Sequence, residues 1–165
     1  MKTYRINFGI LLGALLSLSF MLTACDDDDD NTTIPDAEIV TLNQVALTGA
    51  NEVPAVSTQA TGTFRGTYNM DTNVMTYTIN FQGITPIAMH FHKGAVGVSG
   101  PVTVPINPGN SNDPYSSTNP FSSPMTRSTS PLTDAQEAEL LAGEWYINIH
   151  SSQYPDGEIR GQVTR

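Results

Sequence analysis

The chain has 165 residues, of which 39% are hydrophobic, and this is enough for the core of one compact domain but not of two. Lysine and arginine total 7 against 16 acidic residues, so the formal net charge of -9 leaves no basic surface for nucleic acid. A single cysteine excludes both an internal disulfide framework and a cysteine-rich zinc module.

Residues 1–24 are predicted to be a signal peptide, because Lys2 and Arg5 precede an apolar run that is shorter than a membrane span. The run ends in Leu22-Thr23-Ala24-Cys25, which resembles the lipobox of bacterial lipoproteins. In that motif the cysteine becomes the acylated first residue, so we expect Cys25 to carry palmitate-type chains that anchor the protein to the membrane. The alternative is an ordinary secreted protein whose cysteine lies there by chance.

Residues 25–35 are predicted to be a flexible stalk, because the five adjacent carboxylates of Asp26–Asp30 repel one another and stay solvated. An acidic run directly after a lipidated cysteine also resembles the export signal of lipoproteins displayed on the outer membrane. We therefore expect a location in the cell envelope, anchored to the outer membrane and facing either the periplasm or the outside. The folded domain is expected to span residues 36–165.

Within this domain, apolar residues alternate with polar ones, which is typical of β-strands with one buried face. The predicted strands are Ala37–Leu47, Thr61–Asn69, Val74–Gln82, Ile87–Lys93, Val102–Ile106, Trp145–Ser151 and Glu158–Thr164. The Ser-, Thr- and Pro-rich segment 107–131 is predicted to be a long loop, with room for an edge strand over Phe121–Thr129. Thr133 and Gln136 form a capping box that predicts one short helix, about Asp134–Ala142, before the last two strands. The sequence thus predicts an all-β, antiparallel two-layer sandwich or flattened barrel of about seven strands.

Four segments resemble, in this order, the CHRD (chordin-type) domain: Leu47–Pro54, His90–Gly94, Leu132–His150 and Pro155–Gln162. The resemblance covers about Val45–Val163. It implies an all-β, extracytoplasmic domain without an established activity in bacteria. The long loop departs from the family pattern.

The three histidines of the chain, His90, His92 and His150, all lie in these segments. Residues two apart on a strand share a face, so the histidines are expected opposite the apolar residues, on the outer face of the sheet. The same alternation adds a supporting polar patch of Tyr146, Asn148, Glu158 and Arg160.

Three neutral imidazoles that converge on one point could bind zinc or copper with one position left open. Alternatively, the side chains form a hydrogen-bonded network without any ligand. His90-Phe91-His92 also resembles the copper-binding strand of copper/zinc superoxide dismutases, but the fourth histidine needed to bridge two metals is absent, so dismutase activity is not expected.

No catalytic pattern is evident, since the only cysteine belongs to the lipobox and no serine sits in a glycine-flanked elbow. We therefore do not expect this protein to be an enzyme. The leading hypothesis is a lipid-anchored, non-catalytic binding or structural module without a cofactor, with an unidentified protein or glycan partner at the cell surface. The competing hypothesis is a metal-binding protein that uses the three histidines.

Overall fold

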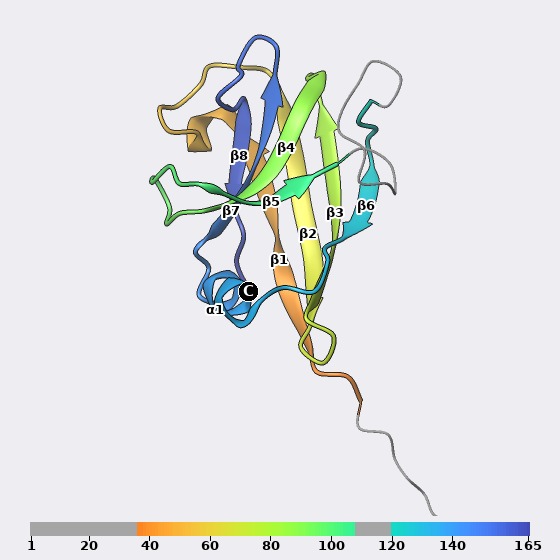
Figure 1. The fold of residues 1–165 in the computed structure, drawn as a ribbon. Coiled ribbons are helices and arrows are strands. Elements are labelled where there is room, and N and C mark those ends of the chain that lie inside the picture. Colours follow the sequence, from red (N-terminus) through yellow and green to blue (C-terminus); the bar gives the residue numbers. More distant parts are fainter. Residues whose placement is uncertain (1–35, 108–119) are drawn as a thin grey trace, which may run out of the picture. The chain divides into compact units, whose positions relative to one another are not determined.

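The computed structural model describes residues 36–107 and 120–165, in which the strands form one antiparallel sheet in the order β5-β4-β7-β8-β1-β2-β3-β6 (Figure 1). The elements are β1 (Ile39–Thr48), the 3-10 helix η1 (Gly49–Asn51), β2 (Thr61–Asn69), β3 (Val74–Gln82), β4 (Pro86–Lys93), β5 (Val102–Ile106), β6 (Met125–Ser128), α1 (Asp134–Leu141), β7 (Trp145–Ser151) and β8 (Ile159–Gln162). The all-β class with one short helix before the last two strands is confirmed.

The predicted signal peptide, Cys25 and the stalk lie outside the described residues, as does the part 108–119 of the long loop. No helix in the described part of the chain has the length and hydropathy that would be needed to cross a membrane.

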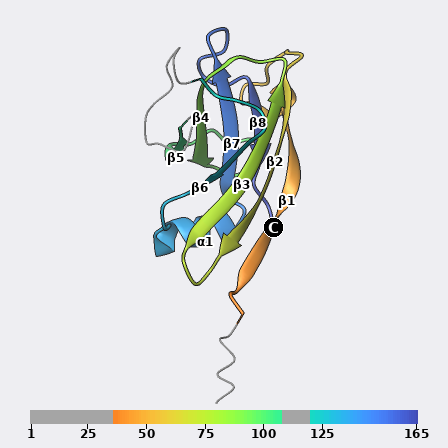
Figure 2. The same cartoon turned by 90° about the vertical axis from the view of Figure 1, so that its right-hand side faces the viewer.

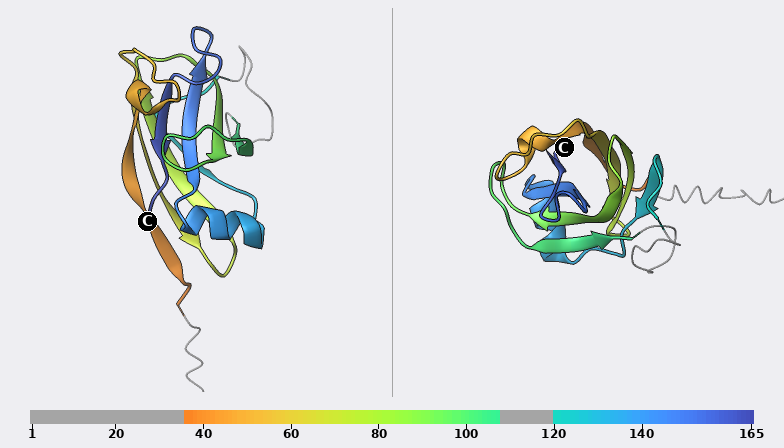
Figure 3. Two further views of the ribbon diagram at one scale, coloured as in Figure 1. Left: turned by 90° about the vertical axis from the view of Figure 1, so that its left-hand side faces the viewer. Right: turned by 90° about the horizontal axis from the view of Figure 1, so that it is seen from above.

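The sheet is continuous and curls on itself, as the view from above in Figure 3 shows, so the barrel-like alternative describes it better than two separate sheets. The described residues form eight strands rather than about seven, because residues 125–128 pair with β3 as an edge strand within the range Phe121–Thr129. This strand, β6, forms one edge of the sheet and β5 forms the other. Both edge strands are short, and β5 contains Pro105.

The concave side of the sheet holds the core because alternate residues of each strand point to it. On β3, Met75, Tyr77 and Ile79 are buried as the alternation predicts, and on β4 Met89 and Phe91 are fully buried. Aromatic rings fill the centre: Phe91 makes edge contacts with Phe64 and Tyr77. The His90 and His92 side chains, one residue away from Phe91, therefore lie on the opposite face of β4.

Helix α1 lies at the end of the sheet where the β2–β3 turn is found (Figures 1 and 2). It begins with the predicted capping box, in which Thr133 and Gln136 each accept a hydrogen bond from the main chain of the other. It ends before Gly143, whose positive φ of 73° suits the left-handed position after a helix. Leu140 is buried, and Glu139 accepts hydrogen bonds from Lys93 and Trp145. These contacts fix the chain at the start of β7, which carries His150.

Candidate metal centre

His90, His92 and His150 lie on two neighbouring strands and on the same face of the sheet. Strands β4 and β7 pair in a register that places His150 opposite Ala88 and His90 opposite Asn148. One ring nitrogen from each histidine lies within 4.8 Å of the others. The structure therefore brings together the three side chains that the sequence singled out.

The histidines lie on the face of the sheet opposite the core, as expected, but this face is largely covered, with His90 half-buried and His92 and His150 buried. His92, His150 and Asn148 are 8%, 7% and 2% exposed. Two loops lie against this face: residues 52–60 after η1, through Glu52 beside Asn148, and residues 94–101 between β4 and β5, through Gly100 beside His92. The loops are joined to each other, because the Ser99 hydroxyl donates to the carbonyl oxygen of Val53 at 3.2 Å. The buried polar groups of this site therefore need hydrogen-bond partners.

Main-chain carbonyl groups fix the protonation of two of the imidazoles. Nδ1 of His92 lies 3.0 Å from the Gly100 carbonyl oxygen, and Nδ1 of His150 lies 2.9 Å from that of Pro155. A carbonyl oxygen only accepts hydrogen bonds, so each Nδ1 carries the proton and each Nε2 presents a lone pair. This is the arrangement by which proteins orient histidine ligands of metal ions.

The lone pair of His150 faces the third imidazole, since its Nε2 lies 3.0 Å from Nδ1 of His90. In a domain without metal, His90 therefore donates to His150. Nε2 of His92 has no hydrogen-bond partner among the described residues, although it is buried. A buried lone pair without a donor is costly, and a metal ion would satisfy it.

Burial keeps the three imidazoles neutral at pH 7. It lowers the pKa of His90 to about 4, helped by the two neighbouring imidazoles. Burial also lowers the pKa values of His92 and His150, against the opposing effect of their carbonyl partners. The neutral imidazole is the form that binds metal ions, so the site needs no deprotonation of its ligands near neutral pH.

The spacing fits one shared ion after a small closure. Two nitrogens on a tetrahedral ion with bonds of about 2.1 Å lie roughly 3.4 Å apart. The separation of 3.0 Å between His90 and His150 is near this value. Pairs as wide as the 4.8 Å limit of the cluster would need to close by roughly 1.4 Å, which side-chain rotation can supply.

The residues of the predicted supporting patch contact the histidines or the loops beside them. The Tyr146 ring stacks on His92 with centroids 4.8 Å apart, and the Arg160 guanidinium lies 3.3 Å from the centroid of Tyr146. Arg160 also donates to the carbonyl oxygens of Ala95 and Val98, which holds one covering loop in place. Glu158 accepts a hydrogen bond of 2.6 Å from Thr58, a residue of the other loop.

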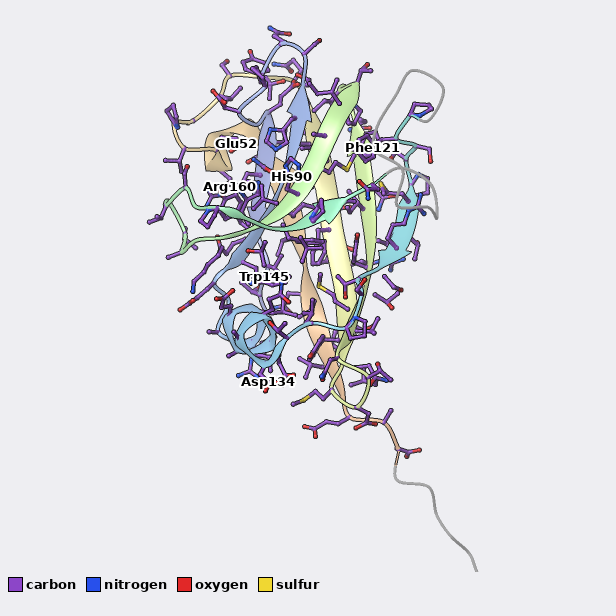
Figure 4. The ribbon with its side chains drawn as sticks, in the orientation of Figure 1. Glu52, His90, Phe121, Asp134, Trp145 and Arg160 are labelled. Carbon is purple, nitrogen blue, oxygen red and sulfur yellow. The ribbon has the colours of Figure 1, made fainter. Side chains whose placement is uncertain are left out.

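Glu52 is a buried acidic residue beside the site that sequence reasoning did not single out as a site residue. It is 8% exposed and lies in the same part of the domain as His90 and Arg160 (Figure 4). Burial raises the pKa of Glu52 to about 7, against the opposing effects of Arg160 and Asn148. The signal available in the sequence was its position in the segment Leu47–Pro54, one of the four on which the resemblance rests.

Comparison with known families identifies the domain. The family model of the CHRD domain matches residues 43–163. The chain belongs to the CHRD family. The matched span contains all three histidines, Glu52 and the supporting patch, and its limits agree with the predicted resemblance. Searches of curated proteins and of solved structures returned no match, so the CHRD assignment rests on the family model.

Proposed function

We propose that the CHRD domain of this protein binds one transition-metal ion, zinc or copper, through His90, His92 and His150. The observation that carries this proposal is the orientation of the imidazoles. Carbonyl groups of Gly100 and Pro155 hold the Nδ1 protons of His92 and His150, so the lone pair of each ring is on Nε2, the atom that would bind the ion. All-nitrogen ligand sets of neutral imidazoles suit zinc and copper.

A hydrogen-bonded network without metal is the second candidate, and the contact between His90 and His150 favours it. That contact satisfies both ring nitrogens without an ion. It leaves Nε2 of His92 unpaired, however, so it accounts for only part of the cluster.

Metal titration distinguishes the two candidates. Zinc and copper are each added to the metal-free, full-length protein, and binding is followed by elemental analysis and by the melting temperature. Metal binding predicts one ion per chain and a stabilisation of about 2.7 kcal/mol when the free ion is at 100 times its Kd. His92→Ala should abolish both effects, whereas the matched alanine substitution of Asn80, an exposed residue on β3, should preserve them. No bound metal and an unchanged melting temperature would contradict the proposal.

We further propose that the domain works at the cell envelope, anchored by lipid on Cys25, and that it acts by binding rather than by catalysis. The lipobox-like Leu22-Thr23-Ala24-Cys25 and the acidic run after it support a lipoprotein of the outer membrane. A protein or glycan on the cell surface fits as a partner, whereas the net charge of -9 disfavours nucleic acid. Cys25→Ser should move the protein from the membrane fraction to the soluble fraction; unchanged membrane association would contradict the anchor.

A further inference from the structure

Glu52, Asn148 and His92 follow one another in space, with Asn148 between the other two, and they leave three buried atoms unpaired. Oε1 of Glu52, Oδ1 of Asn148 and Nε2 of His92 have no hydrogen-bond partner among the described residues. Asn148 acts on both neighbours: its amide lowers the pKa of Glu52 by favouring the ionised carboxyl group, and it raises the pKa of His92 because an amide oxygen can accept from the protonated ring. The amide therefore stands between the carboxyl group and the imidazole. Each buried unpaired group has a free-energy cost, so three together call for an explanation.

The orientation of the Asn148 amide explains why these atoms are unpaired. A Cβ atom built on Gly157 would lie 2.6 Å from Oε1 of Glu52 and 2.7 Å from Nδ2 of Asn148, so the amide nitrogen is on the side of Glu52. The amide oxygen then faces Nε2 of His92, which is also an acceptor because Nδ1 of this ring holds the proton. Two acceptors that face each other cannot form a hydrogen bond.

A half-turn of the amide pairs all three atoms if Glu52 carries a proton. Nδ2 of Asn148 then donates to Nε2 of His92, and Oδ1 of Asn148 accepts from the protonated carboxyl group of Glu52. When a metal ion takes the lone pair of His92, the amide no longer has an acceptor there. It can return to the orientation in which Nδ2 donates to an ionised Glu52.

We propose that Glu52 and Asn148 form a proton-linked partner of the metal centre, in which metal binding at His92 turns the Asn148 amide and releases the proton of Glu52 to solvent. This inference rests on the proposed metal site. The proton balance is simple, because His90 can keep its proton by moving it from Nδ1 to Nε2, and the other two imidazoles keep theirs on Nδ1. The one proton that leaves the protein comes from Glu52.

The surroundings of Glu52 suit this role. Its carboxyl group is buried, which raises its pKa to about 7, while the Arg160 guanidinium of β8 and the Val53 main chain favour the ionised form. Glu52 also lines a pocket of about 280 Å³ together with Asp156, a second acidic residue, from the β7–β8 turn. This pocket gives the proton a route to solvent. Asn148 separates Glu52 from His92, so the carboxyl group is not itself a ligand of the proposed ion.

Calorimetry of zinc binding to the full-length protein tests the inference. Titrations at pH 7 in buffers of different ionisation enthalpy give the number of protons released for each zinc ion bound. We expect about half a proton from Glu52 in the wild type, because a group with a pKa near 7 is half protonated at this pH. Glu52→Gln should still bind zinc and should lose this release. Glu38→Gln is the control, since Glu38 is an exposed acidic residue just before β1 that the site does not use, and it should keep the release.

A second measurement needs no variant. The infrared absorption of a protonated carboxyl group should be present in the metal-free wild type at pH 7 and should disappear when zinc binds. Equal proton release by the wild type and by Glu52→Gln, or a protonated carboxyl signal that zinc leaves unchanged, would overturn the inference and leave the metal site intact. Failure of the wild type to bind zinc would instead overturn the proposed function.

Discussion

Nδ1 of His90 and Nε2 of His150 lie 3.0 Å apart, although the two residues are separated by 60 positions in the chain. Only one proton fits between them, so the pair is stable while both rings are neutral. A second proton would place two positive charges in contact beneath the covering loops. The histidine cluster should therefore make the domain sensitive to acid.

We expect the domain to lose stability as the pH falls from about 7 to about 5. The pKa of His90 is lowered from 6.5 to about 4 in the folded state. Below pH 6.5 the unfolded chain binds a proton on His90, whereas the folded domain does not. The free energy of unfolding is therefore unaffected by His90 above pH 6.5 and decreases as the pH falls from 6.5 toward 4. Thermal melting should show a decrease of several degrees over this range.

The control for this prediction is His90→Gln, which should show a smaller decrease. Glu52 acts in the opposite sense, because its raised pKa favours the folded state at lower pH. The His90→Gln substitution is therefore made in the Glu52→Gln variant, and the double variant is compared with Glu52→Gln alone. Equal decreases with and without His90 would show that the imidazole does not cause the acid sensitivity.

Gly157→Ala should destabilise the domain by about 1–3 kcal/mol in urea denaturation. Its φ of 131° is unfavourable for other residues, and a Cβ atom would collide with Glu52 and Asn148. Gly97→Ala is the matched control, because Gly97 also has a positive φ but no atom within 4 Å of its built Cβ. If both variants lose the same free energy, backbone strain alone is responsible and the contact with Glu52 is irrelevant.

Arg160→Lys should loosen the loop 94–101 even though the positive charge is kept. The guanidinium of Arg160 lies on the Tyr146 ring and donates to two carbonyl oxygens of that loop, and an ammonium group cannot reproduce this planar arrangement. Faster amide hydrogen exchange at Gly94 and Gly100 is expected, with a loss of about 1–2 kcal/mol. Arg65→Lys, on an exposed position of β2, should leave exchange there unchanged.

Thr133→Ala should cost about 1 kcal/mol of unfolding free energy, because the hydroxyl group accepts the Gln136 amide hydrogen at the start of α1. Gln136→Ala removes the reciprocal bond. The double variant should lose less than the sum of the two single losses, since each bond supports the other. Additive losses would argue against a cooperative capping box.

The strands, the helix and the grouping of the histidines were predictable because they follow from local rules. Alternation on β3 and β4 places Tyr77 and Phe91 in the core and His90 and His92 on the opposite face. The capping box of Thr133 and Gln136 marks the start of α1 without reference to the rest of the chain.

The burial of the site was not predictable by these rules. It depends on two loops that return over the sheet, and the residues that hold them, such as Ser99 and Val53, are distant in sequence. The carbonyl groups that orient the imidazoles belong to the main chain, so no side-chain pattern reports them. Glu52 was missed as a site residue for the same reason: its environment is created by Asn148 and Arg160 from strands far along the chain.

The two edge strands of the curled sheet affect whether copies of the domain associate with one another. Exposed strand borders can recruit strands of other molecules and so begin aggregation. Here one border has only the four residues of β6, and the other contains Pro105, which has no amide hydrogen to offer. Both features disfavour strand exchange between copies, so we expect the domain to remain a separate folded unit even at high concentration.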